Sequence, residues 1–124
     1  MHILVIGAGG MLGAKLLARL GNEGKLGGKA ISRVTRYDAV IPPAPPASNY
    51  PVETFVGDLS AAGEAEKLIA GKPDVIFHLA AIVSGEAEKD FEKGYRINLD
   101  ATRILFEVIR KVGGGYKPKL IFTS

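Results

Sequence analysis

Short apolar runs alternate with amphipathic stretches along the chain, a pattern typical of helices packed on a sheet. The apolar runs, one of them weaker than the others, predict strands over residues 2–6, 31–37, 52–56, 75–79 and 120–123. Apolar residues at helical spacing predict helices over residues 11–22, 62–70 and 90–112. Strands that alternate with helices need right-handed crossovers between parallel neighbours, so the pattern predicts an α/β fold with a doubly wound parallel sheet.

The two longer predicted helices differ in how much apolar surface they carry. The first has a single stripe, formed by Leu12, Leu16, Leu17 and Leu20. The long helix has one stripe of Ile97, Ala101, Ile104, Leu105, Val108 and Val112, and a second of Tyr95, Leu99 and Phe106. One face is enough for docking on a sheet, so the second stripe predicts a partner helix and a homodimer through residues 90–112. The alternative is a helix buried on both sides within one chain.

Residues 42–51 interrupt the alternation, because the prolines among them exclude a helix between the second and third predicted strands. We expect an extended surface loop there and no domain boundary. The chain has 124 residues, 47% of them hydrophobic, which is enough for one core. A single domain over residues 1–124 is therefore expected.

Composition narrows the function classes. The absence of cysteine excludes a disulfide framework and a thiolate metal site, and two distant histidines do not predict zinc. With no apolar run long enough for a membrane span and no leader sequence, we expect a cytoplasmic protein without a membrane partner. The net charge of +3 is unevenly placed, with the basic excess in residues 1–36, where Glu23 is the one acidic residue. Without interleaved aromatic residues this excess does not predict nucleic-acid binding; it fits a solvated helix face or attraction of an anionic cofactor.

Candidate chemistry begins where the first predicted strand ends, in the run Gly7-Ala8-Gly9-Gly10-Met11-Leu12-Gly13. A strand, a tight glycine turn and a helix in this order can hold a pyrophosphate. Glycines let the backbone approach the ligand, and unpaired N–H groups of the first helical turn point at its oxygens. The spacing G-x-x-G-x-x-G departs from the commonest dinucleotide fingerprint. The alternative is a glycine-rich turn that only meets a backbone requirement.

Asp38 follows the second predicted strand, where the adenosine ribose of a dinucleotide arrives. A carboxylate there accepts two hydrogen bonds from the ribose hydroxyls and repels a 2′-phosphate, which favours NAD over NADP. Arg33 and Arg36 would weaken that preference if either guanidinium turned toward the ribose. The alternative is that Asp38 only closes a turn.

Two further strand ends carry candidate residues on the side of a parallel sheet where ligands bind. Asp58 and Leu59 follow the third predicted strand, and an acid there can accept from the adenine amino group. Leu79, Ala80 and Ala81 follow the fourth, and the small residues among them let the backbone approach the cofactor. The alternative for Asp58 is a helix cap.

Together with the run Asn98-Leu99-Asp100-Ala101-Thr102, these motifs resemble the extended short-chain dehydrogenase/reductase family, which includes sugar-nucleotide epimerases and dehydratases. The resemblance covers the whole chain and implies a Rossmann-type fold that binds NAD. It assigns the pyrophosphate to Gly7, Gly10, Met11 and Leu12, the ribose to Asp38, the adenine to Asp58 and Leu59, the middle of the cofactor to Leu79, Ala80 and Ala81, and the nicotinamide side to Asn98. Ala101 replaces a glycine that is usual in the family, a change that a helix tolerates.

Within the family, residues 72–98 resemble the branch that oxidises four-carbon sugar acids such as D-erythronate with NAD. The resemblance places the family's catalytic serine one residue after Ser124, and the family's Tyr-x-x-x-Lys acid/base pair does not occur in the sequence. We therefore expect a Rossmann sheet truncated after its fifth strand, the NAD-binding half of a sugar-acid dehydrogenase, inactive by itself. The alternatives are an epimerase or dehydratase of the same family and a dinucleotide-binding module without catalysis.

Overall fold

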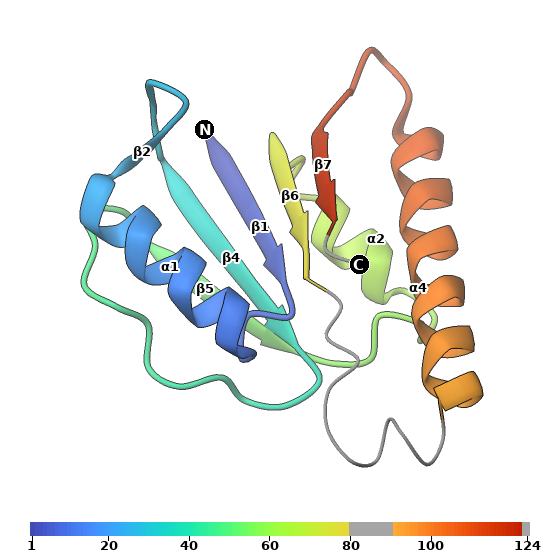
Figure 1. Ribbon diagram of the computed structural model, residues 1–124. Helices are drawn as coiled ribbons and strands as arrows, with labels where there is room; N and C mark the ends of the chain where they lie inside the picture. Colours follow the sequence, from blue (N-terminus) through green and yellow to red (C-terminus); the bar gives the residue numbers. More distant parts are fainter. Residues whose placement is uncertain (80–90, 123–124) are drawn as a thin grey trace.

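Five parallel strands form the central sheet in the computed structural model, which describes residues 1–79 and 91–122 without the side chains of 91–99. The strands are β1 (His2–Ile6), β4 (Arg33–Asp38), β5 (Val52–Val56), β6 (Val75–His78) and β7 (Lys119–Phe122). Their spatial order is β5-β4-β1-β6-β7, so the chain starts at the centre, builds one side, and returns to build the other (Figure 1). Every neighbouring pair is parallel, which confirms the predicted doubly wound sheet.

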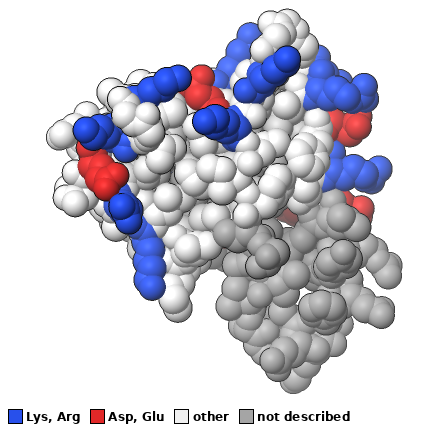
Figure 2. Space-filling model, turned by 45° about the horizontal axis from the view of Figure 1, so that its top comes forward, with Lys and Arg blue, Asp and Glu red and all other residues white. Residues whose placement is uncertain are grey.

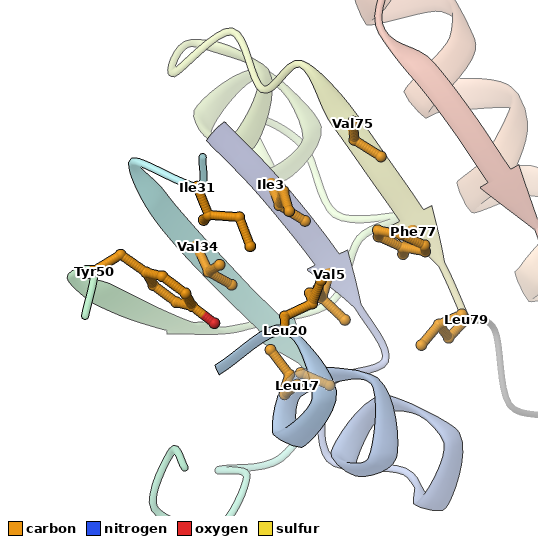
Figure 3. Packing of buried hydrophobic residues seen from close by; sticks show 11 residues of the cluster. Ile3, Val5, Leu17, Leu20, Ile31, Val34, Tyr50, Val75, Phe77 and Leu79 are labelled. Carbon is orange, nitrogen blue, oxygen red and sulfur yellow. The ribbon is translucent and has the colours of Figure 1, made fainter. Parts of the chain in front are cut away.

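Helices cover both faces of this sheet. One face packs against α1 (Met11–Glu23), and the other packs against α2 (Glu64–Ile69) and α4 (Phe91–Val112) (Figure 1). No described helix is long and apolar enough to cross a membrane. Each face has its own apolar cluster, and Figure 3 draws the one under α1, whose buried members are Ile3, Val5, Ala8, Leu17, Leu20, Ile31, Val34, Tyr50, Val75, Phe77 and Leu79.

The central position of β1 explains its uninterrupted apolar sequence. Ile3 and Val5 belong to the cluster under α1, whereas Leu4 and Ile6 belong to the cluster under α2 and α4. A strand that is buried on both faces needs apolar residues at consecutive positions rather than at alternate ones. Each of these side chains contributes about 1.5–3 kcal/mol by leaving water.

Among the described side chains, three apolar residues of the predicted helical stripes lie outside the core. Leu12 is 52% exposed, because the first turn of α1 packs beside the loop after β1, through Gly13, and not over a strand. Phe106 on α4 and Val112 at its end are also exposed, although Ala101 is buried as predicted. The stripes therefore identify the helices correctly but overestimate the apolar surface that the described fold covers.

Apolar periodicity does not predict the short antiparallel hairpin of β2 (Lys25–Leu26) and β3 (Lys29–Ala30). Strands of two residues are too short to show an alternating pattern. Gly27 and Gly28 form the tip of the hairpin with φ values of +57° and +81°, which favour glycine. The hairpin follows α1 directly and leads the chain to the amino end of β4.

Residues 39–51, which we call the proline-rich segment, connect β4 to β5 without a helix, as predicted (Figure 1). The segment is nevertheless anchored rather than free on the surface, because Pro42 and Tyr50 are buried. The Ala47 carbonyl oxygen lies so close to α1 that a Cβ added to Gly21 would be 2.6 Å from it. The segment therefore occupies the place beside α1 where a crossover helix would otherwise lie.

Candidate functional site

The glycine loop after β1 is held close to the neighbouring strands. The Gly7 amide donates to the Tyr37 carbonyl oxygen over 2.8 Å, and Gly7 has a φ of +87°. A Cβ at Gly7 would collide with the Leu79 carbonyl group that follows β6. A Cβ at Gly13 would lie 2.5 Å from the Gly7 carbonyl oxygen, so this glycine lets α1 start directly against the loop. The loop is thus a tight turn between three elements, as the pyrophosphate hypothesis requires.

The amino end of α1 lies open at this loop. Gly10 is the residue that begins the helix, no side chain caps it within the described part of the chain, and its first turn contains no acidic residue. The side chains of Met11 and Leu12 project into solvent, with exposures of 78% and 52%. Unpaired amide groups and the positive end of the helix dipole therefore face an uncovered surface, an arrangement that favours a negatively charged group.

Asp38, the last residue of β4, lies beside the same loop. Its Oδ2 accepts a hydrogen bond from the Gly9 amide at 2.7 Å, and its Oδ1 accepts from the Ala39 amide at 2.6 Å. The absence of a side chain at Gly9 makes this approach feasible, because a Cβ there would be 2.8 Å from Asp38 Oδ2. A carboxylate offers about four acceptor positions, so its remaining lone pairs are available to hydroxyl groups of a ligand. The structure thus brings together the two motifs that the sequence singled out separately.

Both guanidiniums that could neutralise Asp38 have partners elsewhere. Arg36 is 5% exposed; its Nε and Nη2 donate to Thr54 Oγ1 at 3.1 and 2.9 Å, and its Nη1 donates to the Pro43 carbonyl oxygen at 2.6 Å. Burial lowers the pKa of this guanidinium. Arg33 lies at the opposite end of β4 from Asp38 and donates to Glu53. Among the described residues, neither guanidinium forms an ion pair with Asp38.

Asp58 and Leu59 behave differently from the glycine loop and Asp38. Asp58 Oδ1 accepts hydrogen bonds from the amide and the hydroxyl of Ser60, at 2.9 and 2.7 Å, and these bonds lower the pKa of the carboxyl group. These bonds form a local turn rather than the helix cap that was the alternative interpretation of Asp58, because α2 begins at Glu64 after Gly63. The Leu59 side chain is 7% exposed and packs in the cluster under α2 and α4. Any contact of Leu59 with a ligand would therefore involve its backbone.

The remaining predicted site residues are only partly described. Leu79 is buried under α1, its amide donates to the Ile6 carbonyl oxygen at 2.9 Å, and its own carbonyl faces Gly7. Ala80, Ala81 and Ser124 lie outside the described residues. Asn98 falls within α4, and its side chain is outside the description.

Sequence reasoning did not single out the side chain of His78, which ends β6 beside the candidate site. It is 3% exposed, its Nε2 lies 3.0 Å from Thr102 Oγ1, and its ring contacts Phe122 with centroids 5.6 Å apart. Its Nδ1 has no hydrogen-bond partner among the described residues, and burial lowers the pKa of the ring. A histidine at the end of an otherwise apolar strand was the available signal. The ring lies between β6, β7 and α4, where burial disfavours its protonated form.

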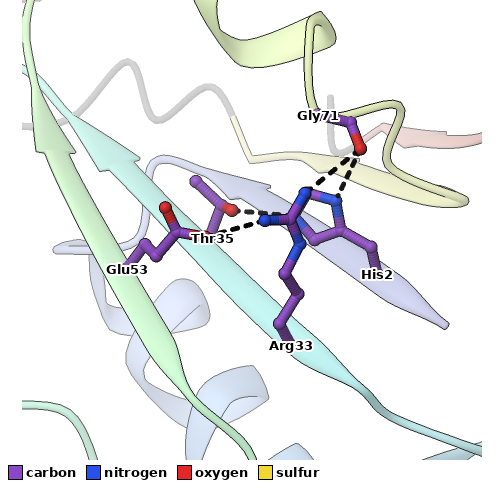
Figure 4. Close-up of polar contacts among 5 residues, drawn as sticks. All are labelled: His2, Arg33, Thr35, Glu53 and Gly71. Atoms are coloured by element: carbon purple, nitrogen blue, oxygen red, sulfur yellow. Dashed lines mark hydrogen bonds and ion pairs between the residues drawn. The ribbon is translucent and has the colours of Figure 1, made fainter.

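A second polar cluster lies at the opposite end of the strands from the candidate site, near their amino ends (Figure 4). His2 Nε2 is 2.7 Å from Thr35 Oγ1, and His2 Nδ1 is 3.3 Å from the Gly71 carbonyl oxygen. The same carbonyl accepts from Arg33, which also forms an exposed ion pair with Glu53. Because ligands bind at the carboxyl ends of parallel strands, this cluster is structural and does not extend the candidate site.

The basic residues do not form a single patch on the face shown in Figure 2, where uncharged surface separates the Lys and Arg side chains. Arg33 and Arg36 are bound within the fold. Lys15 and Arg19 are exposed on α1. This dispersed arrangement agrees with a solvated surface, one of the interpretations left open by the sequence.

A parallel sheet of this strand order, with a glycine turn after its first strand and an acid ending the next, defines a Rossmann-type dinucleotide-binding fold. The residues present fit such a ligand, because the first turn of α1 carries neither a side-chain cap nor an acidic residue and the Asp38 carboxylate lies beside the loop. The chain belongs to the NAD dependent epimerase/dehydratase family, whose sequence model matches residues 3–124.

Named relatives agree with this family. Two proteins called D-erythronate dehydrogenase, from Cupriavidus necator and Haemophilus influenzae, are 41% and 36% identical over 100% of this chain. A crystal structure named as the nucleoside-diphosphate-sugar epimerase from Agrobacterium tumefaciens is 59% identical with a TM-score of 0.90, and the match covers 100% of this chain and 37% of that one. The chain spans 38% of the length of each of the two D-erythronate dehydrogenases.

Proposed function

We propose that the chain is the NAD-binding half of an oxidoreductase that oxidises a hydroxyl of a four-carbon sugar acid, such as D-erythronate, by hydride transfer to NAD. The observation that carries the proposal is the contact between the Asp38 carboxylate and the Gly9 amide. This contact brings the ribose and pyrophosphate motifs together at the carboxyl ends of two neighbouring strands. The substrate class rests on the two relatives named D-erythronate dehydrogenase.

In this proposal Gly7 and Gly10 line the pyrophosphate with backbone that carries no side chain, and the first-turn amides of Met11 and Leu12 donate hydrogen bonds to it. Asp38 accepts hydrogen bonds from the adenosine ribose. The remaining contacts follow the family resemblance, with adenine at Asp58 and Leu59, the middle of the cofactor at Leu79, Ala80 and Ala81, and the nicotinamide side at Asn98. When bound, the nicotinamide ring supplies the hydride acceptor.

The positions of the two arginines support NAD rather than NADP. A 2′-phosphate placed 4 Å from the Asp38 carboxylate would be repelled by about 4 kcal/mol per unit charge at an effective dielectric of about 20. The guanidinium of Arg36 donates to Thr54 and Pro43 and is therefore not available to offset this repulsion. Asp38 therefore selects a ribose that has free hydroxyl groups.

Calorimetric titration of the protein with NAD and NADP tests the cofactor proposal. We expect NAD to bind at least tenfold more tightly than NADP, about 1.4 kcal/mol or more. The 124 residues by themselves should bind NAD without oxidising a substrate, because they contain no Tyr-x-x-x-Lys pair to act as acid and base. Folded protein that releases no heat with either dinucleotide would refute the proposal.

A sugar-nucleotide epimerase is the second candidate function, because the 59% identical structure carries the name of a nucleoside-diphosphate-sugar epimerase. The two functions differ in the fate of the hydride. A dehydrogenase releases NADH at the rate of substrate oxidation, whereas an epimerase returns the hydride and produces no net NADH. Absorbance at the NADH band, with D-erythronate or a UDP-sugar added to the full-length protein, separates them.

A further inference from the structure

The proline-rich segment is ordered without the usual backbone pairing of a helix or strand. Its prolines have no N–H to donate, so side chains and carbonyl groups must hold it in place. At its far end Tyr50 is buried under α1, and the Ser48 hydroxyl donates to the Tyr50 carbonyl oxygen at 2.9 Å. At its near end the holding group is the guanidinium of Arg36.

Arg36 bridges the sheet and this segment. Arg36 and Thr54 are directly paired in the register of β4 and β5, and two guanidinium nitrogens donate to the Thr54 hydroxyl. The third donates to the Pro43 carbonyl oxygen at 2.6 Å, the shortest of the three bonds. No ion pair to Arg36 is formed within the described part of the chain. Burying a guanidinium against neutral oxygens alone costs free energy of folding. We therefore expect these bonds to hold the proline-rich segment in a position that the fold or the site requires.

The group that Arg36 holds lies next to the candidate site. Pro43 directly follows Pro42, and Pro42 is packed against the glycine loop, where a Cβ at Gly9 would be 3.5 Å from Pro42 Cβ. Gly9 is the residue whose amide binds Asp38. A movement of the Pro43 carbonyl would therefore also move Pro42, which lies beside the carboxylate that we propose binds the ribose.

The same part of the chain exposes apolar surface. Val40 and Ile41, immediately before Pro42, are 67% and 82% exposed. Met11 and Leu12, in the first turn of α1 directly after the glycine loop, are also exposed. Large apolar side chains exposed at a polar site are suited to cover the faces of an aromatic base such as adenine.

We infer that the proline-rich segment forms the outer wall of the adenosine end of the dinucleotide site, and that Arg36 is the positioning residue that holds this wall. The inference rests on the proposed function. Release of Arg36 should weaken binding of the adenosine half of the cofactor, while the amides that bind the pyrophosphate stay in place. Arg36 then serves the site without touching the ligand.

Calorimetric titrations of the full-length protein with NAD and with ADP test this inference. The variants are Arg36→Met and Thr54→Val. The matched control is Arg33→Met, which makes the same exchange at the amino end of the same strand, away from the candidate site. We expect Arg36→Met to weaken both ligands about tenfold, the effect of one hydrogen bond to a charged group. Thr54→Val leaves the bond from Arg36 to the Pro43 carbonyl in place, so it should weaken both ligands less, about threefold. Arg33→Met should leave both dissociation constants within about twofold of the wild type.

The fitted stoichiometry separates positioning from folding. A residue with a merely structural role lowers the fraction of protein that binds and leaves the dissociation constant of that fraction unchanged. Arg36→Lys, which keeps one donor for the Pro43 carbonyl, should recover part of the affinity for ADP. If Arg36→Met fails to fold, Thr54→Val decides, because it removes two of the three bonds and keeps the arginine.

Two outcomes overturn different statements. A wild-type protein that binds NAD, with Arg36 and Thr54 variants that bind it equally well, overturns the role of Arg36 and leaves the proposed function standing. A folded wild-type protein that binds no dinucleotide overturns the proposed function, and the inference about the segment falls with it.

Discussion

Asp38 has neighbours that leave its negative charge uncompensated. Its two oxygens accept from the amides of Gly9 and Ala39, which orient the carboxylate without neutralising it. Arg36, only two residues earlier on the strand, is bound to Thr54 and Pro43. The carboxylate therefore keeps both its acceptor capacity and its repulsion of phosphate.

Replacement of this carboxylate should change cofactor choice. In Asp38→Asn the amide oxygen still accepts from Gly9, but the negative charge is lost, so we expect NAD to bind about tenfold more weakly and NADP to bind more tightly. The ratio of the two dissociation constants, measured by calorimetry, reports the effect. Glu53→Gln removes an equal charge near the amino end of β5, away from the candidate site, and should leave the ratio unchanged.

Sequence reasoning identified Asp38 because an acid at the end of a predicted strand has a defined position relative to a glycine loop. It did not identify the partners of Arg36, because a long side chain can turn in several directions. The direction depends on Thr54 and Pro43, which belong to a neighbouring strand and a segment without periodicity. Nor did it identify the hydrogen bonds of Asp58 Oδ1 to Ser60, and the adenine contact assigned to Asp58 stays a prediction.

The two buried histidines predict how stability depends on pH. Burial lowers the pKa of His2 and of His78 below the ordinary value of 6.5, so in the folded protein both rings resist protonation. As the pH falls through about 6.5 the unfolded chain takes up protons that the folded chain does not, and the folded state loses stability. We expect lower urea midpoints at pH 5.5 than at pH 7.5.

The variant His78→Phe keeps a ring against Phe122 and removes one of the two titrating groups. Its loss of stability between those two pH values should be smaller than that of the wild type. Asp58 does not account for the change, because its lowered pKa confines its contribution to more acidic solutions. An identical loss in the variant and the wild type would contradict the assignment.

At the scale of secondary-structure elements, the junction between β1 and α1 depends on close backbone packing. A Cβ at Gly13 would be 2.5 Å from the Gly7 carbonyl oxygen and 2.9 Å from the Ala8 Cα. These are backbone atoms, which cannot turn aside as a flexible side chain would. The helix would have to move away from the loop to accept any side chain at this position.

We therefore expect Gly13→Ala to destabilise the fold by about 1–3 kcal/mol, although alanine is the better helix former. NAD affinity should fall as well, because the displaced helix no longer directs its first-turn amides at the loop. Urea unfolding and calorimetry measure the two effects. Lys15→Ala, at an exposed position two residues further along α1, should change neither. A stable Gly13→Ala variant would show that the junction has more room than its geometry indicates.

The elements that the sequence predicted well are those with long apolar patterns. The five strands of the sheet and the three helices were each located to within about two residues. The hairpin of β2 and β3 was missed because its strands are short and its residues exposed. Leu12 belongs to the predicted apolar stripe but is exposed, because periodicity does not show where a helix extends beyond the sheet below it.

At the scale of the whole molecule, the surface formed by α4 and β7 exposes apolar groups. Phe106 and Phe122 are 44% and 45% exposed, and their ring centroids are 5.6 Å apart. Ile121, on the opposite face of the same edge strand, is also 42% exposed. A surface of this kind tends to be covered by another protein segment.

We predict that a second copy of the protein covers it and that the protein forms a homodimer through α4. Introduction of charge by Leu99→Glu and Phe106→Lys should convert the dimer to a monomer, which sedimentation equilibrium measures. Circular dichroism serves as the control for folding. An unchanged mass in a folded double variant would instead favour coverage of this helix within one chain.

The proline-rich connection has a consequence for the order in which the sheet comes apart. β5 forms one edge of the sheet and, among the described strands, pairs with β4 alone. No described helix follows it on the α1 side, and all five of its residues remain partly or fully exposed. In amide hydrogen exchange, the protons of β5 should be replaced by deuterium earlier than those of β1, whose five residues are all buried. Fraying of the native state would then start at the strand that carries Thr54, so the wall beside the ribose would loosen before the pyrophosphate cradle does.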